Sequence, residues 1–451
     1  MRLSLRPFAA FAAAVLLAAL STGSARATAA PPGDQPLPGY TIVNPPLTPA
    51  SVGGSPSRVI QGVRDHAGFI IEVPPGWNGE LVLYAHGYAG TGTVLAVGPP
   101  PFGLRQRLLD QGYAWAASSY YRNGYDVRAG VLTTRRLAEH FADVVGEPGR
   151  RYLAGVSMGG HIIGRSLEQY PGYYDGALPM CGALGDNRLF DYFLDYNLVA
   201  QALAGVDEYP VGPDYAAVTV PKIQQELGLA GLVPGGPDTL NALGRQFRDI
   251  VVNRTGGPRP GAAASFAFWK DFPFGLAASA TPGAPDLADD PGRVATNLGT
   301  RYTPDSPFDV NAEVRRVPPA DLAARLSERL SQVPRIDGRP GVPVLSVHNI
   351  GDLFVPLSME QIYAGDVARH HQSENLVQRA IRSTGHCEFT PAEAGAAWDD
   401  LVAWVEDGTR PAGDAVADPA AVADPGFGCR FSDAAAWTAG VGSRRLFGAC
   451  A

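Results

Sequence analysis

The motif Gly155-Val156-Ser157-Met158-Gly159 constrains the fold of this chain more than any other part of its sequence. It follows an apolar run over 152–156, typical of a buried strand, and precedes a segment with helical spacing that ends near Tyr170. A Gly-x-Ser-x-Gly motif between a strand and a helix forms a sharp, strained turn that presents the serine hydroxyl at the start of the helix. The sequence therefore predicts Ser157 as an exposed nucleophile.

Strand and helix patterns alternate on both sides of this motif. Strands are predicted from Val59 onward, over 68–73, 81–85, 113–118, 152–156, 176–180, 342–349 and 376–382. Helices are predicted over 102–111, 127–145, 158–170, 358–368 and 391–406. The alternation indicates an α/β fold with a mostly parallel sheet and helices on both faces.

The alternation stops between 183 and 340. This stretch contains helical patterns over 189–203, 220–227 and 238–252, joined by Gly- and Pro-rich segments. We interpret it as a large, mainly helical cap inserted into a catalytic domain formed by 58–182 and 341–408. Residues 409–451 are predicted to form a C-terminal tail, in which a disulfide could close a loop.

The N-terminus has the pattern of a secretory signal peptide. Arg2 and Arg6 precede an apolar run over 8–20, which is shorter than the roughly 20 residues of a membrane span, and Ala25-Arg26-Ala27 resembles a cleavage site. We expect 1–27 to be removed, although cleavage after Ala29 or Ala30 remains open. A Pro- and Gly-rich leader with little structure follows over 28–57. The mature protein is expected to be secreted and not held in a membrane.

The charge of the chain excludes one class of partner. Its 36 basic and 44 acidic residues give a formal net charge of −8. Loss of the three arginines of the signal peptide leaves 33 basic residues and a net charge of −11. Nucleic-acid binding is therefore not expected.

A second chemical signal follows the predicted strand 81–85. There His86-Gly87-Tyr88 forms a loop whose backbone amides could stabilise the negative charge that develops during acyl transfer. We predict that the amides of Tyr88 and Met158 form an oxyanion hole. His86 itself is interpreted as a structural residue of this loop.

The partners of a nucleophilic serine lie near the end of the chain. Asp352 follows the strand 344–349, and His386 lies in a loop after the last strand, so the order Ser157, Asp352, His386 is that of a Ser…Asp…His triad. Asp186 is the alternative acid. The other histidines lie in predicted helices or strands, or before the sheet, or, for His86, in the loop just described; they are His66, His140, His161, His348, His370 and His371.

On these residues the chain resembles serine hydrolases of the α/β-hydrolase fold. The resemblance implies an eight-stranded sheet and a triad of Ser157, Asp352 and His386. The His-Gly-Tyr loop paired with Gly-x-Ser-Met-Gly also resembles cutinase-like polyester hydrolases. The insertion and the cysteine after His386 resemble the feruloyl esterase/tannase family, in which that cysteine is bridged to one beside the nucleophile; here the neighbour is Val156.

Four cysteines allow three disulfide pairings, and the sequence does not choose among them. We favour Cys181–Cys387, which would tether the loop of His386 to the sheet, together with Cys429–Cys450 in the tail. No C-x-x-C motif or paired histidine spacing indicates a metal, and no cofactor is expected.

The predicted activity is hydrolysis of a small or polymeric carboxylic ester through an acyl-enzyme on Ser157. A peptidase or amidase, or a secreted acyltransferase, would use the same triad and remains an alternative. Tyr120, Tyr121, Phe190 and Trp269 are candidates for the substrate pocket because they lie near the cleft or in the cap.

Overall fold

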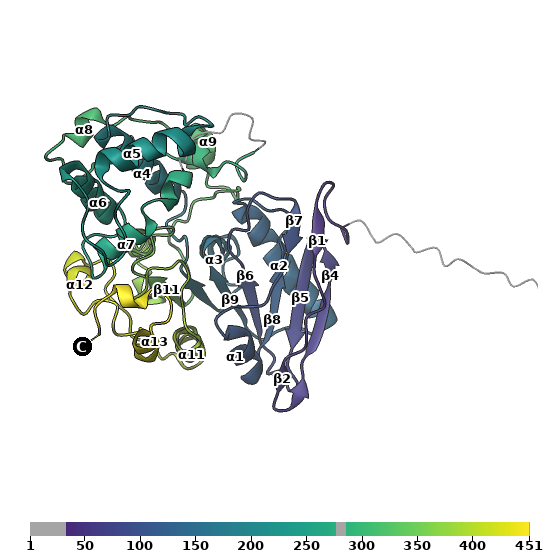
Figure 1. The fold of residues 1–451 in the computed structure, drawn as a ribbon. Helices are drawn as coiled ribbons and strands as arrows, with labels where there is room; N and C mark the ends of the chain where they lie inside the picture. The colour runs from purple at the N-terminus through teal and green to yellow at the C-terminus, as the bar shows by residue number, and fades with distance from the viewer. Residues whose placement is uncertain (1–32, 277–285, 451) are drawn as a thin grey trace, which may run out of the picture.

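A single large sheet organises the computed structural model, which describes residues 33–276 and 286–450 (Figure 1). Its eight strands lie in the order β12-β11-β10-β9-β6-β8-β5-β4. Only the pairs β4–β5 and β5–β8 are antiparallel, which confirms the mostly parallel sheet. The strands are β4 (Arg58–Arg64), β5 (Ala67–Val73), β6 (Leu81–Ala85), β8 (Ala114–Ser118), β9 (Arg151–Val156), β10 (Gly176–Met180), β11 (Val344–Asn349) and β12 (Leu376–Ile381).

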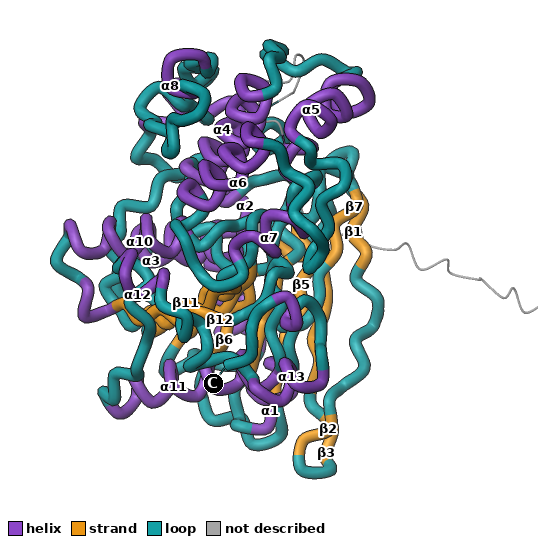
Figure 2. Tube along the Cα trace, turned by 60° about the vertical axis from the view of Figure 1, so that its left-hand side comes forward, coloured by secondary structure: helices purple, strands orange, loops and turns teal. Residues whose placement is uncertain are grey.

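Helices cover both faces of this sheet (Figure 2). One face packs against α1 (Leu104–Asp110) and α11 (Pro391–Asp407), with Trp115 and Trp398 in the core between them. The other face packs against α2 (Val127–Val144), α3 (Met158–Gln169) and α10 (Ser358–Arg369), around residues such as Phe141 and Tyr363. Every residue of the central strands β6, β8 and β10 is buried, which explains their continuous apolar runs.

The insertion between β10 and β11 lies beyond one end of the sheet (Figure 1). Its described residues form helices and no strand: α4 (Arg188–Leu203), η1 (Tyr215–Thr219), α5 (Val220–Leu227), α6 (Ala242–Arg254), α7 (Ala262–Trp269), η2 (Phe272–Leu276), η3 (Pro291–Val294), α8 (Val310–Glu313) and α9 (Leu322–Leu326). In its core, Phe247 makes edge contacts with both Tyr196 and Phe266. Aromatic residues of the insertion therefore contribute to its own hydrophobic core.

The leader departs from the prediction of little structure. Within it, β1 (Thr41–Val43) pairs with β7 (Val94–Ala96), and β2 (Ser51–Val52) pairs with β3 (Ser55–Pro56). The buried carboxylate of Glu72 holds this region, because it accepts hydrogen bonds from the Ala50 amide and the Ser57 hydroxyl. The prediction was wrong because these partners are distant in sequence. The proposed signal peptide, 1–27, lies outside the described residues.

The C-terminal segment, residues 409–450, packs against the sheet. It contains α12 (Pro419–Ala423), α13 (Ala434–Ala439) and η5 (Arg444–Leu446), while a short turn η4 (Ser373–Asn375) precedes β12. Val422 and Phe447 pack with Ile350 and Ala380, at the ends of β11 and β12. None of the described helices is both long enough and apolar enough to span a membrane.

Candidate active site

Ser157 lies on the turn between β9 and α3 with a φ of 57°, in the left-handed region that non-glycine residues rarely adopt. The flanking glycines make this turn possible. A Cβ on Gly159 would lie 2.1 Å from the Ala85 carbonyl oxygen, and one on Gly155 would lie 2.7 Å from the same atom. The close approach of β6 therefore requires glycine at both positions. The strained turn predicted from the sequence is present.

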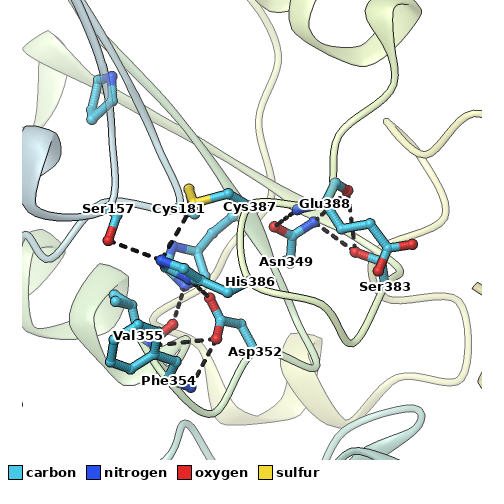
Figure 3. Close-up of a disulfide and its surroundings, with 12 residues drawn as sticks. Ser157, Cys181, Asn349, Asp352, Phe354, Val355, Ser383, His386, Cys387 and Glu388 are labelled. Carbon is cyan, nitrogen blue, oxygen red and sulfur yellow. Dashed lines mark hydrogen bonds and ion pairs between the residues drawn. A yellow bond between two sulfur atoms is a disulfide. The ribbon is translucent and has the colours of Figure 1, made fainter. Parts of the chain in front are cut away.

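A hydrogen-bonded chain connects Ser157 to His386 and Asp352 (Figure 3). The Ser157 Oγ lies 2.9 Å from His386 Nε2, and His386 Nδ1 lies 2.6 Å from Asp352 Oδ2. Because an ionised carboxylate only accepts hydrogen bonds, the proton of the neutral imidazole lies on Nδ1 and leaves Nε2 as the acceptor for the serine hydroxyl. The three residues are therefore arranged for transfer of the serine proton to His386.

Backbone amides fix the acid of this chain. Asp352 is fully buried, and its Oδ1 accepts hydrogen bonds from the amides of Phe354 (2.8 Å) and Val355 (3.2 Å). His348 supports the turn that carries these amides, because its Nε2 lies 2.7 Å from the Val355 carbonyl oxygen. Asp352 is thus satisfied on both oxygens and held in one orientation.

His348 was not singled out in the sequence, where it appeared only as a strand residue. Its Nδ1 lies 3.2 Å from Glu360 Oε1 in a fully buried pair. Burial lowers the pKa of His348, but the hydrogen bond and charge of Glu360 outweigh it and raise that pKa above its ordinary value. A buried titratable residue on the strand that precedes an acid is the signal that could have identified it.

Asp186, the alternative acid, forms no hydrogen bond or ion pair with His386 in the described structure. It forms an ion pair with Arg188 at 3.1 Å and accepts a hydrogen bond from the Ile336 amide at 3.0 Å. Burial raises its pKa. Its contacts connect the start of the insertion to its end, so Asp186 has a structural role.

The loop His86-Gly87-Tyr88 lies directly against the nucleophile. A Cβ on Gly87 would lie 3.0 Å from the Ser157 Cβ, so the loop backbone contacts the serine. The ring of His86 stacks on Tyr120 at 4.0 Å, and the Tyr120 hydroxyl donates to the His86 carbonyl oxygen at 3.0 Å. Burial lowers the pKa of His86, which therefore remains a neutral support for the loop.

A cavity of about 320 Å³ opens above Ser157. Tyr88 and Met158, the predicted oxyanion residues, both line it, together with Ser157. The remaining lining residues are mainly apolar: Tyr125, Ala183, Leu189, Phe190, Phe193, Val211, Gly275, Leu276, Asp289, Asp290, Pro291, Gly292, Phe354 and Val355. The insertion therefore supplies most of these residues, and the turn after Asp352 and Tyr125, just before α2, supply the rest.

Of the four residues proposed for substrate contact, only Phe190 lines this cavity. Tyr120 is buried against the loop His86-Gly87-Tyr88, where its ring and hydroxyl contact His86. Trp269 is also buried, and its indole N–H donates to the Thr384 carbonyl oxygen at 2.8 Å. Tyr121 is half-buried and is not among the lining residues. The sequence located the aromatic segments but not which of their faces the fold turns towards Ser157.

The two disulfides favoured from the sequence are both present. Cys181, directly after β10, is bonded to Cys387, and Cys429 is bonded to Cys450 (Figure 3 shows the first). Cys387 follows His386 in the chain, so the first bridge ties the loop of the histidine to the sheet. Cys181, Cys387 and His386 also form a group with the spacing of metal ligands, but disulfide-bonded cysteines offer no thiolate to a metal.

Comparisons with known proteins point towards hydrolases. No protein-family model matches the chain. A sequence relative, o-phthalyl amidase from Xanthobacter agilis, is 24% identical over 415 residues, covering 78% of this chain and 88% of the relative.

Two solved structures from Aspergillus oryzae were also found. An esterase has a TM-score of 0.46 at 15% identity, covering 83% of this chain and 86% of its own. Feruloyl esterase B has a TM-score of 0.42 at 14% identity, covering 76% and 79% respectively.

Four features of the chain itself define its fold class. The sheet has eight mostly parallel strands, the strained serine turn follows the fifth of them, and the loop His86-Gly87-Tyr88 follows the third. Ser157, Asp352 and His386 occur in the order of this class and are joined by hydrogen bonds. The chain has the α/β-hydrolase fold, and the sequence relative it resembles is a hydrolase.

Proposed function

We propose that this protein is a secreted serine hydrolase that cleaves carboxylic esters through an acyl-enzyme on Ser157. The observation that carries the proposal is the pair of distances that join Ser157 to His386 (2.9 Å) and His386 to Asp352 (2.6 Å). A serine hydroxyl is a weak nucleophile unless a base within hydrogen-bond reach accepts its proton, and His386 fulfils that requirement.

In the proposed mechanism, Ser157 Oγ attacks the ester carbonyl carbon while its proton moves to His386 Nε2. The carbonyl oxygen becomes an oxyanion held by the amides of Met158 and Tyr88, and Asp352 stabilises the imidazolium through Nδ1–H. The carbon–oxygen bond of the alcohol then breaks, and His386 returns the proton to the leaving alkoxide. Water, deprotonated by His386, attacks the acyl-enzyme, which releases the acid and regenerates Ser157.

The cavity supports an apolar or aromatic acyl group. Phe190 and Phe193 of α4 and Phe354 of the acid turn line it with Leu189 and Leu276. Burial of such a group in an apolar pocket contributes roughly 25 cal/mol per Å² of apolar surface removed from water. Esters with aromatic acyl groups are therefore the preferred candidates.

An amidase is the second candidate, because the sequence relative described above is named an amidase. The same triad performs both reactions, and they differ in the leaving group that His386 must protonate. Acyl transfer to an alcohol differs only in the nucleophile of the second step.

Secretion forms part of the proposal. Two disulfides are typical of proteins that fold in an oxidising compartment, and the sequence of 1–27 supplies the signal expected for export.

A matched panel of p-nitrophenyl esters and p-nitroanilides, each with acetyl, hexanoyl and benzoyl groups, tests the proposal. The esters should be hydrolysed, and Ser157→Ala should lower kcat by at least about 10⁴-fold. The wild type should react with a fluorophosphonate probe at Ser157. Faster turnover of the anilides would favour the amidase, and ester products formed in added methanol at the expense of acid would favour the transferase. Equal activity of Ser157→Ala would refute the triad.

A further inference from the structure

His386 lies on a loop between β12 and α11, outside any helix or strand. Such a loop needs support from elsewhere to hold an imidazole at hydrogen-bond distance from its serine. The Cys181–Cys387 disulfide anchors it after the histidine. The part before the histidine, Thr384 and Gly385, is held by a different region, the C-terminal segment (residues 409–450).

Ser443 makes the central contacts. Its Oγ accepts hydrogen bonds from the amides of Thr384 (2.6 Å) and Gly385 (3.1 Å), immediately before His386. The same hydroxyl donates to Glu388 Oε2 at 2.6 Å, and the Ser443 amide donates to Glu388 Oε1 at 2.8 Å. Gly385 also donates to Glu388 Oε2 at 3.0 Å. One serine therefore joins the residues on both sides of His386.

Arg444, the next residue, fixes Ser443 in place. It is almost fully buried and forms an ion pair with Glu393 at 2.8 Å, in the first turn of α11. Its guanidinium also donates to the carbonyl oxygens of Glu388 (3.2 Å) and Arg382 (3.3 Å). The end of the segment is thus attached to the helix that follows the loop.

Gly442 shows how closely the segment approaches. It has a φ of 60°, and a Cβ there would lie 1.8 Å from Glu388 Oε1. A larger residue cannot occupy this position while the Glu388 carboxylate keeps its contacts with Ser443. The hydrogen bonds between Ser443 and the loop of His386 hold the two segments this close together.

We propose that Ser443 and Glu388 are positioning residues for His386, and that the C-terminal segment is a working part of the catalytic apparatus. The inference rests on the proposed function. Loss of the Ser443 hydroxyl removes the acceptor of the Thr384 amide, one of the two acceptors of the Gly385 amide and the donor to Glu388 Oε2. The loop then remains anchored by the disulfide after His386, whereas before it the hydrogen bond from Trp269 to the Thr384 carbonyl oxygen and the one from Gly385 to Glu388 remain. With fewer hydrogen bonds before the histidine, the loop lets Nε2 move away from Ser157, and a misplacement of 1 Å can cost about 100-fold in rate.

The experiment compares Ser443→Ala with Ser443→Thr, which keeps the hydroxyl, and with Thr438→Ala. Thr438 is a matched control because its hydroxyl lies in the same segment and bonds only within α13, to the Ala434 carbonyl oxygen. With a benzoyl ester, Ser443→Ala should lower kcat by about 10- to 100-fold and leave KM within about twofold, because the cavity lining is unchanged. Ser443→Thr should recover most of kcat, and Thr438→Ala should match the wild type.

Glu388→Gln provides the second variant. It keeps the size of the side chain but cannot accept at both terminal atoms, so it should lower kcat in the same way even if Ser443→Ala does not fold. Thermal unfolding of each variant is measured in parallel. A wild-type kcat in Ser443→Ala and Glu388→Gln would overturn the inference. An equal loss of kcat in Ser443→Thr would also overturn it. So would variants that change only KM and the melting temperature while kcat stays at the wild-type value.

The inference and the proposed function fail differently. A wild type that neither turns over esters or amides nor reacts with a fluorophosphonate would refute the proposed function. A wild type that does react, alongside an equally reactive Ser443→Ala, would refute only the positioning role.

Discussion

The insertion between β10 and β11 and the C-terminal segment both lie outside the sheet, yet they reach the candidate catalytic residues in different ways. The insertion provides side chains such as Phe190 and Phe193 to the wall of the cavity over Ser157. The C-terminal segment lines no part of that cavity and instead bonds to the loop of His386 through Ser443. If the proposed function holds, the two additions to one fold act separately, the insertion on substrate choice and the C-terminal segment on the geometry of the reaction.

The largest expected effect concerns the disulfide of the C-terminal segment. The double variant Cys429→Ser/Cys450→Ser removes a bridge across a sequence separation of 21 residues, and such a cross-link is worth about 3 kcal/mol. We expect the segment to open, with earlier proteolytic cleavage after 409 and a kcat decrease similar to that of Ser443→Ala. If kcat is preserved while the segment is cleaved, the C-terminal segment does not position His386.

The next effect concerns the contact between the insertion and the core. Burial lowers the pKa of His161 in α3 to about 4, although its hydrogen bond to the Pro334 carbonyl oxygen (2.7 Å) acts in the opposite direction. Between pH 6.5 and pH 4 the unfolded chain therefore binds the proton more readily, and the folded state loses up to about 3 kcal/mol of stability as pH falls.

Urea unfolding of the wild type and His161→Gln across this pH range measures the effect. The difference in unfolding free energy between the two should shrink as pH falls. Only the wild type has an imidazole at this position that takes up a proton on unfolding, so only its folded state loses stability from this group. A constant difference would show that His161 does not titrate in this way.

A smaller effect is expected from the wall of the insertion. Phe193→Ala removes a ring that stacks with Phe354, and we expect kcat/KM for benzoyl esters to decrease about tenfold, within the 1–3 kcal/mol range of pocket contacts. The acetyl ester should be nearly unaffected because its acyl group does not reach the ring. An equal loss for both esters would indicate that the insertion also positions the triad.

The smallest effect concerns charge. The described lining of the cavity contains Asp289 and Asp290 and no basic residue, and the sequence of 277–285, outside the described residues, has no charged residue either. Asp289→Asn should therefore reduce the preference for a cationic over an anionic ester by a few-fold, about 1 kcal/mol or less at a solvated site. Asp286→Asn is the control, because Asp286 also pairs with Arg122 but does not line the cavity. A preference unchanged in Asp289→Asn would contradict the expectation.

The sheet and its helices could be predicted from the sequence because their signals are local. The helix expected over 127–145 is α2 (Val127–Val144), and the helix expected over 220–227 is α5 (Val220–Leu227). Parallel strands buried on both faces leave long apolar runs, and each amphipathic helix carries its own period.

The prediction was weakest where partners are far apart in the chain. The leader lacks an obvious strand pattern, yet it is bound by Glu72, whose own strand gives no sign of a buried carboxylate. Tyr120 and Trp269 lie on segments near the cavity, but neither lines it. Their hydroxyl and indole groups donate hydrogen bonds to backbone carbonyl oxygens instead.

The sequence by itself determined the fold class, the nucleophile turn and the order of Ser157, Asp352 and His386, because each depends on residue types at short spacing. Only the tertiary structure decided which disulfides form, which aromatic residues face Ser157 and how Ser443 reaches Gly385, which is 58 residues away in the chain. Those features depend on how the insertion and the C-terminal segment pack against the sheet. Such packing is a sum of many long-range contacts, and no local pattern encodes it.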